Sequence, residues 1–258
     1  MKALKGLLIG ISMYSRLPAP QIEWSRENMR YAMCALPLIG LVIGLILWGW
    51  VALADALKID GFLFGAVYAL VPIAVTGGIH IDGLMDTADA LGSRADRARK
   101  LEILKDSHTG AFAVLTCVLY VGCYMALGAE VRWQPEIVAV VIGGMVLERC
   151  LSSIAVASFP CAKDSGLLHA FADVAAKRAV RWFSIALGVC VAALMVAAAP
   201  WQGGAMALAA GVVFLYYYWM SKRQFGGITG DLAGYFQQLC EIVMLAAVVL
   251  VQKLLEVV

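Results

Sequence analysis

Residues 182–221 read WFSIALGVCVAALMVAAAPWQGGAMALAAGVVFLYYYWMS, forty residues without one Asp, Glu, Lys or Arg. A helix needs about 20 apolar residues to cross the hydrocarbon core of a bilayer. Residues 200–204, PWQGG, lie in the middle of the stretch, and proline and glycine both interrupt helices. The stretch therefore predicts two membrane-spanning helices joined by a tight turn.

The rest of the chain has a similar composition. Of its 258 residues, 62% are hydrophobic and 15% are charged, against about 45–50% and about 25% in soluble domains. Five further apolar stretches are about as long as a membrane span: residues 31–54, 61–81, 111–129, 137–158 and 232–252. We therefore expect an all-α, polytopic membrane protein of about seven transmembrane helices. Its length predicts a single membrane-embedded domain over residues 1–258.

The basic residues predict the orientation. If the N-terminus is cytoplasmic, the cytoplasmic segments hold sixteen of the twenty Lys and Arg residues, as the positive-inside rule requires. These segments are residues 1–30, 82–110, 159–181 and 222–231. Residues 1–20 have a basic start and an apolar run, which fits a signal peptide or a segment that lies on the membrane surface or re-enters the membrane. We expect the surface or re-entrant segment.

Charge and cysteine content argue against nucleic-acid-binding, zinc-binding and disulfide-rich classes of protein. The formal net charge of +2 does not indicate nucleic-acid binding. The seven cysteines are scattered, and no two are separated by only two residues, so we expect neither a zinc site nor a disulfide framework.

Residues 77–89, GGIHIDGLMDTAD, contain the main candidate site. Asp82, Asp86 and Asp89 stand at i, i+4 and i+7, which places all three on one face of a helix. Three like charges repel one another, and a hard divalent cation such as Mg²⁺ relieves that repulsion. The spacing favours a Mg²⁺ site, with Asp106 as a candidate fourth ligand, over a solvated acidic helix end.

A second segment repeats part of this pattern. Residues 226–231, GGITGD, match residues 77–82, GGIHID, and both lie at predicted cytoplasmic membrane boundaries. Backbone N–H groups in glycine-rich turns bind anions. The candidate substrate-binding residues are the residues of these turns and one neighbouring cation: Gly77, Gly78, Arg223, Gly226, Gly227, Thr229 and Asp231.

Four further residues are polar in apolar surroundings. Glu148 and Arg149 fit both a role at the site and a structural pair between helices, and we expect Glu241 to be a structural or supporting acid. His80, two residues before Asp82, is a candidate general base, although a carboxylate fits that role as well.

The chain resembles the adenosylcobinamide-GDP ribazoletransferase family, also called the cobalamin-5′-phosphate synthases. The resemblance rests on residues 77–89 and is extended by residues 16–18, RLP, by residues 101–107, LEILKDS, and by residues 225–231, FGGITGD, with Glu241 ten residues further on. The chain departs from the family pattern at Ala90, at residues 108–109 and at Ala113. These departures concern the ends of predicted helices.

The resemblance implies a Mg²⁺-dependent transferase in the bacterial inner membrane, with its active site facing the cytosol. Its substrates would be adenosylcobinamide-GDP and α-ribazole or α-ribazole 5′-phosphate, with GMP released. It implies catalytic roles for Asp82, Asp86, Asp89 and His80 and metal binding by these three carboxylates and Asp106. The expected partners are the lipid bilayer, other cobalamin-assembly enzymes and further copies of the chain, and they do not include nucleic acid.

Three alternatives remain on the residues alone. A CDP-alcohol phosphotransferase also uses a spaced Asp cluster, but its motif carries Ala-Arg after the Asp-Gly pair, where this chain has Leu84-Met85-Asp86. A cation transporter would place its carboxylates near the bilayer midplane. A scaffold without chemistry would give the Asp triad no purpose.

Overall fold

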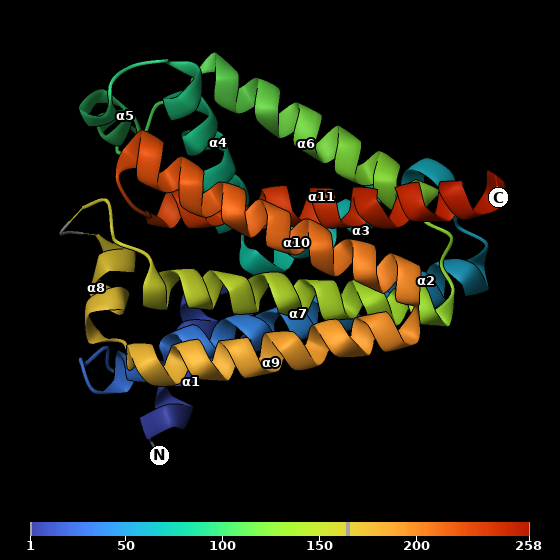
Figure 1. The fold of residues 1–258 in the computed structure, drawn as a ribbon, viewed down its shortest axis with the longest axis horizontal. Coiled ribbons are helices and arrows are strands. Elements are labelled where there is room, and N and C mark those ends of the chain that lie inside the picture. Colours follow the sequence, from blue (N-terminus) through green and yellow to red (C-terminus); the bar gives the residue numbers. More distant parts are fainter. Residues whose placement is uncertain (1, 164–165, 258) are drawn as a thin grey trace.

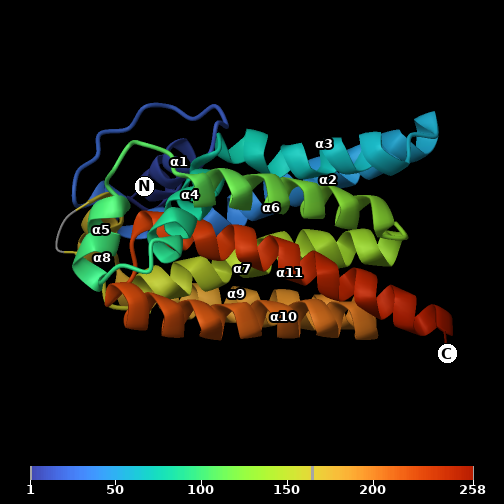
Figure 2. The ribbon, with the colours of Figure 1, turned by 90° about the horizontal axis from the view of Figure 1, so that it is seen from above.

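The structure is a computed structural model that describes residues 2–163 and 166–257. The long helices lie side by side along one axis, and the short helices gather at one end of the bundle, opposite the C-terminus (Figures 1 and 2). The helices are α1 (Lys2–Tyr14), α2 (Leu36–Leu57), α3 (Gly61–Thr76), α4 (Ile79–Gly92), α5 (Arg97–Ile103), α6 (Ala111–Glu130), α7 (Pro135–Ser158), α8 (Leu167–Val174), α9 (Lys177–Ala198), α10 (Pro200–Met220) and α11 (Gly230–Val257). A 3₁₀ segment (Asn28–Ala35) precedes α2, and a π-helical turn (Ser221–Phe225) follows α10.

This architecture confirms an all-helical, polytopic membrane fold. Among the described residues, five helices are long and apolar enough to cross a membrane, and a bent pair, α3 with α4, raises the number to six. These five include α9 and α10, which are separated at Ala199, as the PWQGG sequence predicts. The predicted seventh span is α11, 28 residues long. Helix α11 is not one of the five, and it carries buried Gln237, Gln238 and Glu241.

Helix α7 lies at the centre of the bundle. In its most apolar stretch 72% of the residues are buried, against 22% in α6 and in α9. The outer helices therefore expose apolar side chains such as Leu119 and Val189. Since large exposed apolar faces mark contact with lipid or protein, this pattern fits a bundle surrounded by lipid.

The predicted span at residues 61–81 is not one straight helix, because the chain turns sharply within it. Helix α3 ends at Gly77 (φ 66°) and α4 begins after Gly78 (φ 83°), with an angle of 96° between the two helices. Two consecutive positive φ values suit glycine and strain other residues. Helix α4, 14 residues long, is too short to cross a bilayer, and it extends to the end of the bundle where the short helices gather (Figure 1).

Helices α4 and α11 cross at two glycines. A Cβ atom on Gly83 would lie 2.5 Å from the Asp231 carbonyl oxygen, and one on Gly234 would lie 2.9 Å from the His80 carbonyl oxygen. Larger side chains would therefore push the helices apart. The close crossing brings the Asp82 end of α4 next to the start of α11.

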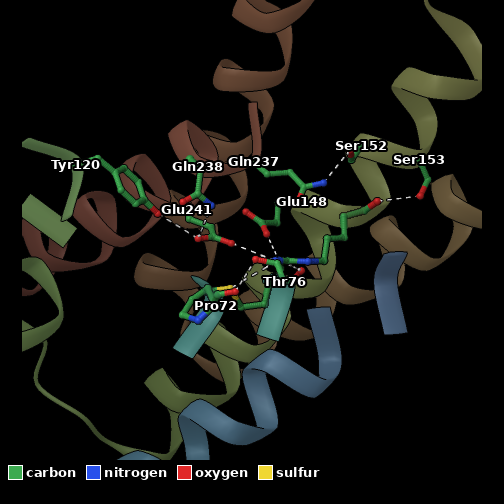
Figure 3. Close-up of polar contacts among 11 residues, drawn as sticks. Pro72, Thr76, Tyr120, Glu148, Ser152, Ser153, Gln237, Gln238 and Glu241 are labelled. Atoms are coloured by element: carbon green, nitrogen blue, oxygen red, sulfur yellow. Dashed lines mark hydrogen bonds and ion pairs between the residues drawn. The ribbon is translucent and has the colours of Figure 1, made fainter. Parts of the chain in front are cut away.

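A buried ion cluster joins α7 to α11. The Arg149 guanidinium donates to Glu148 and, at 3.2 Å, to Glu241, and all three side chains are fully buried. Tyr120 and Gln238 also donate to Glu241, at 3.3 and 3.4 Å (Figure 3). The structure thus supports the structural interpretation of the Glu148–Arg149 pair and confirms the supporting role expected for Glu241.

Candidate active site

Helix α4 carries the predicted carboxylates on successive turns. Asp82 lies in its first turn and is exposed, while Asp86 and Asp89 are half-buried. Asp231 lies in the first turn of α11. Because α4 and α11 cross at Gly83, Asp231 joins the α4 carboxylates at one place.

The carboxylates influence one another electrostatically. Partial burial, together with repulsion from Asp82, Asp231 and Asp89, raises the pKa of Asp86 to about 6. Burial also raises the pKa of Asp231, although a hydrogen bond with Thr229 and the charge of Lys163 act in the opposite direction. The mutual repulsion is therefore not relieved by the cations nearby, which is the situation in which a bound metal ion stabilises an acidic cluster.

Asp89 has a role that the sequence analysis did not predict. Its two carboxylate oxygens accept hydrogen bonds from the backbone N–H groups of Gly110, at 2.6 Å, and Ala113, at 2.9 Å. These N–H groups belong to the start of α6, so Asp89 caps a neighbouring helix. A Cβ atom on Gly110 would lie 2.7 Å from the carboxylate oxygens, which explains glycine at this position.

This cap predicts a stability effect. We expect Asp89→Ala to lower the free energy of unfolding by about 1–2 kcal/mol, as the loss of a helix N-cap typically does. Asp89→Asn, which keeps one acceptor oxygen, should lose about half as much, as measured by thermal unfolding in detergent. If Asp89→Asn instead leaves stability unchanged and abolishes activity, the side chain acts mainly on metal or substrate.

Asp106 and Arg223 lie apart from the other candidates. Asp106 is exposed and accepts hydrogen bonds from the backbone and ring of His108, at 3.0 and 2.6 Å. The Arg223 guanidinium lies 5.2 Å above the Trp219 ring. Neither residue lines the cavity described next, which is also true of Asp86 and Asp89, but Asp106 is not among the carboxylates that raise the pKa of Asp86. The metal role of Asp106 and the substrate role of Arg223 stay predictions.

A cavity of about 360 Å³ lies between α4, α7 and α11, and residues of α1, α2 and α8 also line it. Asp82 and His80 line it from one glycine-rich segment, and Thr229 and Asp231 line it from the other. The two repeated segments therefore lie together, as their shared membrane boundary predicts. Lys105, Lys163 and His169 add basic or titratable groups to the lining.

Each glycine-rich turn begins with a glycine covered by an arginine. A Cβ atom on Gly77 would lie 2.5 Å from Nε of Arg16, and one on Gly226 (φ 81°) would overlap the guanidinium of Arg97. Neither arginine was predicted from the sequence to be a site residue. Both arginines belong to the basic residues of the predicted cytoplasmic segments. Only their contacts in the folded structure distinguish them from the other basic residues there.

The remaining turn residues differ between the two copies. The backbone of Ile228 bonds on both sides with the segment around Cys161, through Pro160 at 2.8 Å and Ala162 at 2.9 Å. A Cβ atom on Gly227 would lie 2.4 Å from the Pro160 carbonyl oxygen, whereas one on Gly78 would meet a side chain no closer than 3.9 Å. Gly227 therefore serves packing, and Gly78 serves the bend between α3 and α4.

The carboxylates fit Mg²⁺ through their chemistry. Within residues 2–163 and 166–257, no three His, Cys, Asp or Glu side chains lie close enough together to form a metal site alone. Mg²⁺ usually takes one or two carboxylates and completes its shell with water and substrate phosphate. In the described part of the chain, no hydrogen bond or ion pair engages the carboxylates of Asp82 and Asp86, and these two residues suit such a partial site.

Comparisons with known proteins agree over nearly the whole chain. Residues 6–249 match the family model described as cobalamin-5-phosphate synthase. A protein of Lachnoclostridium phytofermentans named adenosylcobinamide-GDP ribazoletransferase is 38% identical over 252 residues, covering 98% of this chain and 96% of the relative. Proteins of the same name from Desulfitobacterium hafniense and Azorhizobium caulinodans are each 32% identical, with 95% and 93% of this chain covered and 96% and 93% of the relatives.

No solved structure matches this chain. The sequence comparisons nevertheless decide between the alternatives, since they favour the transferase over a CDP-alcohol phosphotransferase, a cation transporter or a scaffold. The chain belongs to the cobalamin-5-phosphate synthase family, and it is a transferase of cobalamin biosynthesis.

Proposed function

We propose that this protein joins α-ribazole, or its 5′-phosphate, to the cobinamide phosphate of adenosylcobinamide-GDP, with release of GMP. The observation that carries the proposal is the cavity at which Asp82 and Asp231 meet from the two glycine-rich segments. The names of the relatives supply the substrates. The basic cytoplasmic segments support a site that faces the cytosol.

Transfer of a phosphoryl group requires charge stabilisation and positioning more than covalent help from the protein. Bound Mg²⁺ would neutralise charge on the diphosphate and on the leaving group. Asp82 and Asp86, on successive turns of α4, are the residues that would hold it. Lys105 and Lys163 line the cavity together with Asp82, and they supply positive charge for phosphate oxygens.

The acceptor hydroxyl must lose a proton as it attacks. Asp231 faces the α4 carboxylates, and its burial favours the protonated form, so it is suited to take this proton. The hydroxyl oxygen forms a bond to the phosphorus that carries cobinamide, and the bond from that phosphorus to the GMP oxygen breaks. GMP leaves with the bonding electron pair, and Asp231 later returns the proton to solvent.

His80 is less suited than Asp231 to accept the proton from the acceptor hydroxyl. His80 is 5% exposed, whereas Asp82, which lines the same cavity, is exposed. Its predicted role as the general base therefore becomes the less suitable of the two alternatives.

The experiment that tests the function follows GMP release by the protein purified in detergent. We expect release when adenosylcobinamide-GDP, α-ribazole and Mg²⁺ are all present, and none when either substrate is omitted or a chelator is added. Added Mg²⁺ should restore release after chelation. GMP release that continues in excess chelator would contradict the metal assignment, and a folded sample that is silent with all components would contradict the function.

A further inference from the structure

An open groove lies on the outside of the bundle at the start of α9. We call it the α9 groove, and it is lined by Arg30, Tyr31, residues 176–179 and Trp182. Its volume is about 580 Å³. The backbone N–H of Ala176 donates to the carbonyl oxygen of Arg30 at 3.0 Å, which holds the start of α9 against the 3₁₀ segment. Among the described residues, none lines both this groove and the cavity described above, so the groove is separate from the proposed active site.

The α9 groove is positively charged. Three exposed cations line it: Arg30, Lys177 and Arg178. Within residues 2–163 and 166–257, none of the three side chains forms an ion pair or a hydrogen bond, and the acids nearest in sequence have other partners. Glu27 is paired with Lys2, and Asp173 is paired with Arg26. Because three like charges around one groove repel one another, a bound anion would stabilise this arrangement.

An apolar, exposed face of α9 continues from the groove. Four side chains share this face, since they follow one another at intervals of four and seven residues: Arg178, Trp182, Val189 and Val196. Trp182 is 61% exposed, Val189 66% and Val196 41%. Helix α9 is long and apolar enough to cross a membrane, and it begins at the end of the bundle where the short helices gather (Figure 1). Tryptophan is enriched at the boundary between lipid headgroups and hydrocarbon, so Trp182 places the groove at headgroup level.

We propose that the α9 groove binds the headgroup of an anionic phospholipid, whose phosphate oxygens pair with Arg30, Lys177 and Arg178 and whose acyl chains lie along α9. Basic pockets between membrane helices bind phospholipid headgroups, including that of cardiolipin. Cardiolipin carries two phosphates, and three cations match its charge better than that of a lipid with one phosphate. A soluble phosphate ester would pair with the cations but would leave the apolar face of α9 uncovered. The proposal does not depend on the reaction that the protein catalyses.

The test measures thermal unfolding of the purified protein in a neutral detergent while lipid is added, since a ligand of the folded state raises the unfolding temperature. We expect cardiolipin to raise this temperature saturably, phosphatidylglycerol to do so at higher concentration, and phosphatidylcholine to have no effect. Replacing Arg30, Lys177 and Arg178 together by Gln should weaken the apparent affinity for cardiolipin about thirtyfold or more. Each Lys or Arg beside an anionic headgroup contributes about fivefold, so each single Gln variant should lose about that factor.

Matched control variants test the location. Replacing Lys58, Arg132 and Lys253 by Gln also removes three exposed cations, which lie outside the groove and have carboxylate partners. This control should bind cardiolipin as the unmodified protein does.

The aromatic side chain has a control of its own. Trp182→Ala should weaken cardiolipin binding about threefold or more, because the ring packs at headgroup level beside the bound lipid. Trp201→Ala, the same substitution at a side chain that is 71% exposed at the start of α10, should change nothing.

Three results would overturn the proposal. If the triple groove variant binds cardiolipin as tightly as the unmodified protein, these cations do not form the site. If the triple control variant loses as much affinity as the triple groove variant, cardiolipin responds to overall charge and not to the groove. If glycerol 3-phosphate without acyl chains protects the protein at the same concentration as cardiolipin, the groove binds a soluble phosphate. Should the triple groove variant fail to fold, single variants that all keep full affinity would overturn the proposal equally.

Discussion

Asp82→Asn is expected to lower the rate of GMP release by about 10³-fold or more. An amide keeps the shape of the side chain but loses the negative charge that holds a divalent cation, and a metal ion stabilises the transition state by several kcal/mol. The loss should appear in kcat, and high Mg²⁺ should restore part of it, because a weakened metal site fills at higher concentration. Steady-state assays over a range of Mg²⁺ concentrations measure both effects.

Two control variants give this prediction its specificity. Asp55→Asn makes the same change at an exposed carboxylate whose partner is Lys58, at 3.9 Å, and it should leave the rate unchanged. Asp106→Asn should cost less than about threefold, since Asp106 is exposed and bonded to His108. If Asp106→Asn is as damaging as Asp82→Asn, the fourth ligand expected from the sequence belongs to the site after all.

Arg149→Leu is expected to lower the free energy of unfolding by about 3–5 kcal/mol, the usual cost of leaving a buried charge without its partner. The substitution removes the guanidinium that binds both Glu148 and Glu241, and both carboxylates are fully buried. Low yield and a strongly reduced unfolding temperature in detergent would be the result.

A triple variant separates the charge effect from the loss of packing. Glu148→Gln, Arg149→Leu and Glu241→Gln together remove all three charges, and replacing a complete buried ion cluster is often neutral or stabilising. We expect the triple variant to recover most of the stability. Arg132→Leu, which breaks an exposed pair with Glu256, should cost at most about 1 kcal/mol. A triple variant no more stable than Arg149→Leu would show that the arginine acts through packing.

The sequence predicts most of the fold because membrane insertion is a local property. Each apolar stretch contains in its own residues the free energy that places it in lipid, so α2, α6, α7, α9 and α10 lie where the composition predicts them. The bend between α3 and α4 also has a local cause, the pair Gly77–Gly78. Its 96° angle was not foreseen, because hydropathy does not register a change of direction.

Some features of the candidate site could also be predicted from the sequence, and others could not. The spacing of Asp82 and Asp86 on one helix face was readable from the sequence, since helical periodicity is fixed. The residues that Asp82 and Asp86 meet in the folded structure could not be predicted from the sequence. Asp231 meets Asp82 only because two glycines allow α4 and α11 to cross closely, and Asp89 caps α6 only because Gly110 lies against it.

The amino-acid sequence by itself determined the class of fold, the membrane-spanning stretches and the carboxylates of α4, since these depend on composition and on short-range periodicity. Tertiary structure alone decided which residues from distant segments share the cavity. Gln237 and Ser152 share a hydrogen bond although they are 85 positions apart along the chain, and the paired Arg149 and Glu241 are 92 positions apart. Such pairs form through helix packing, which no local pattern encodes.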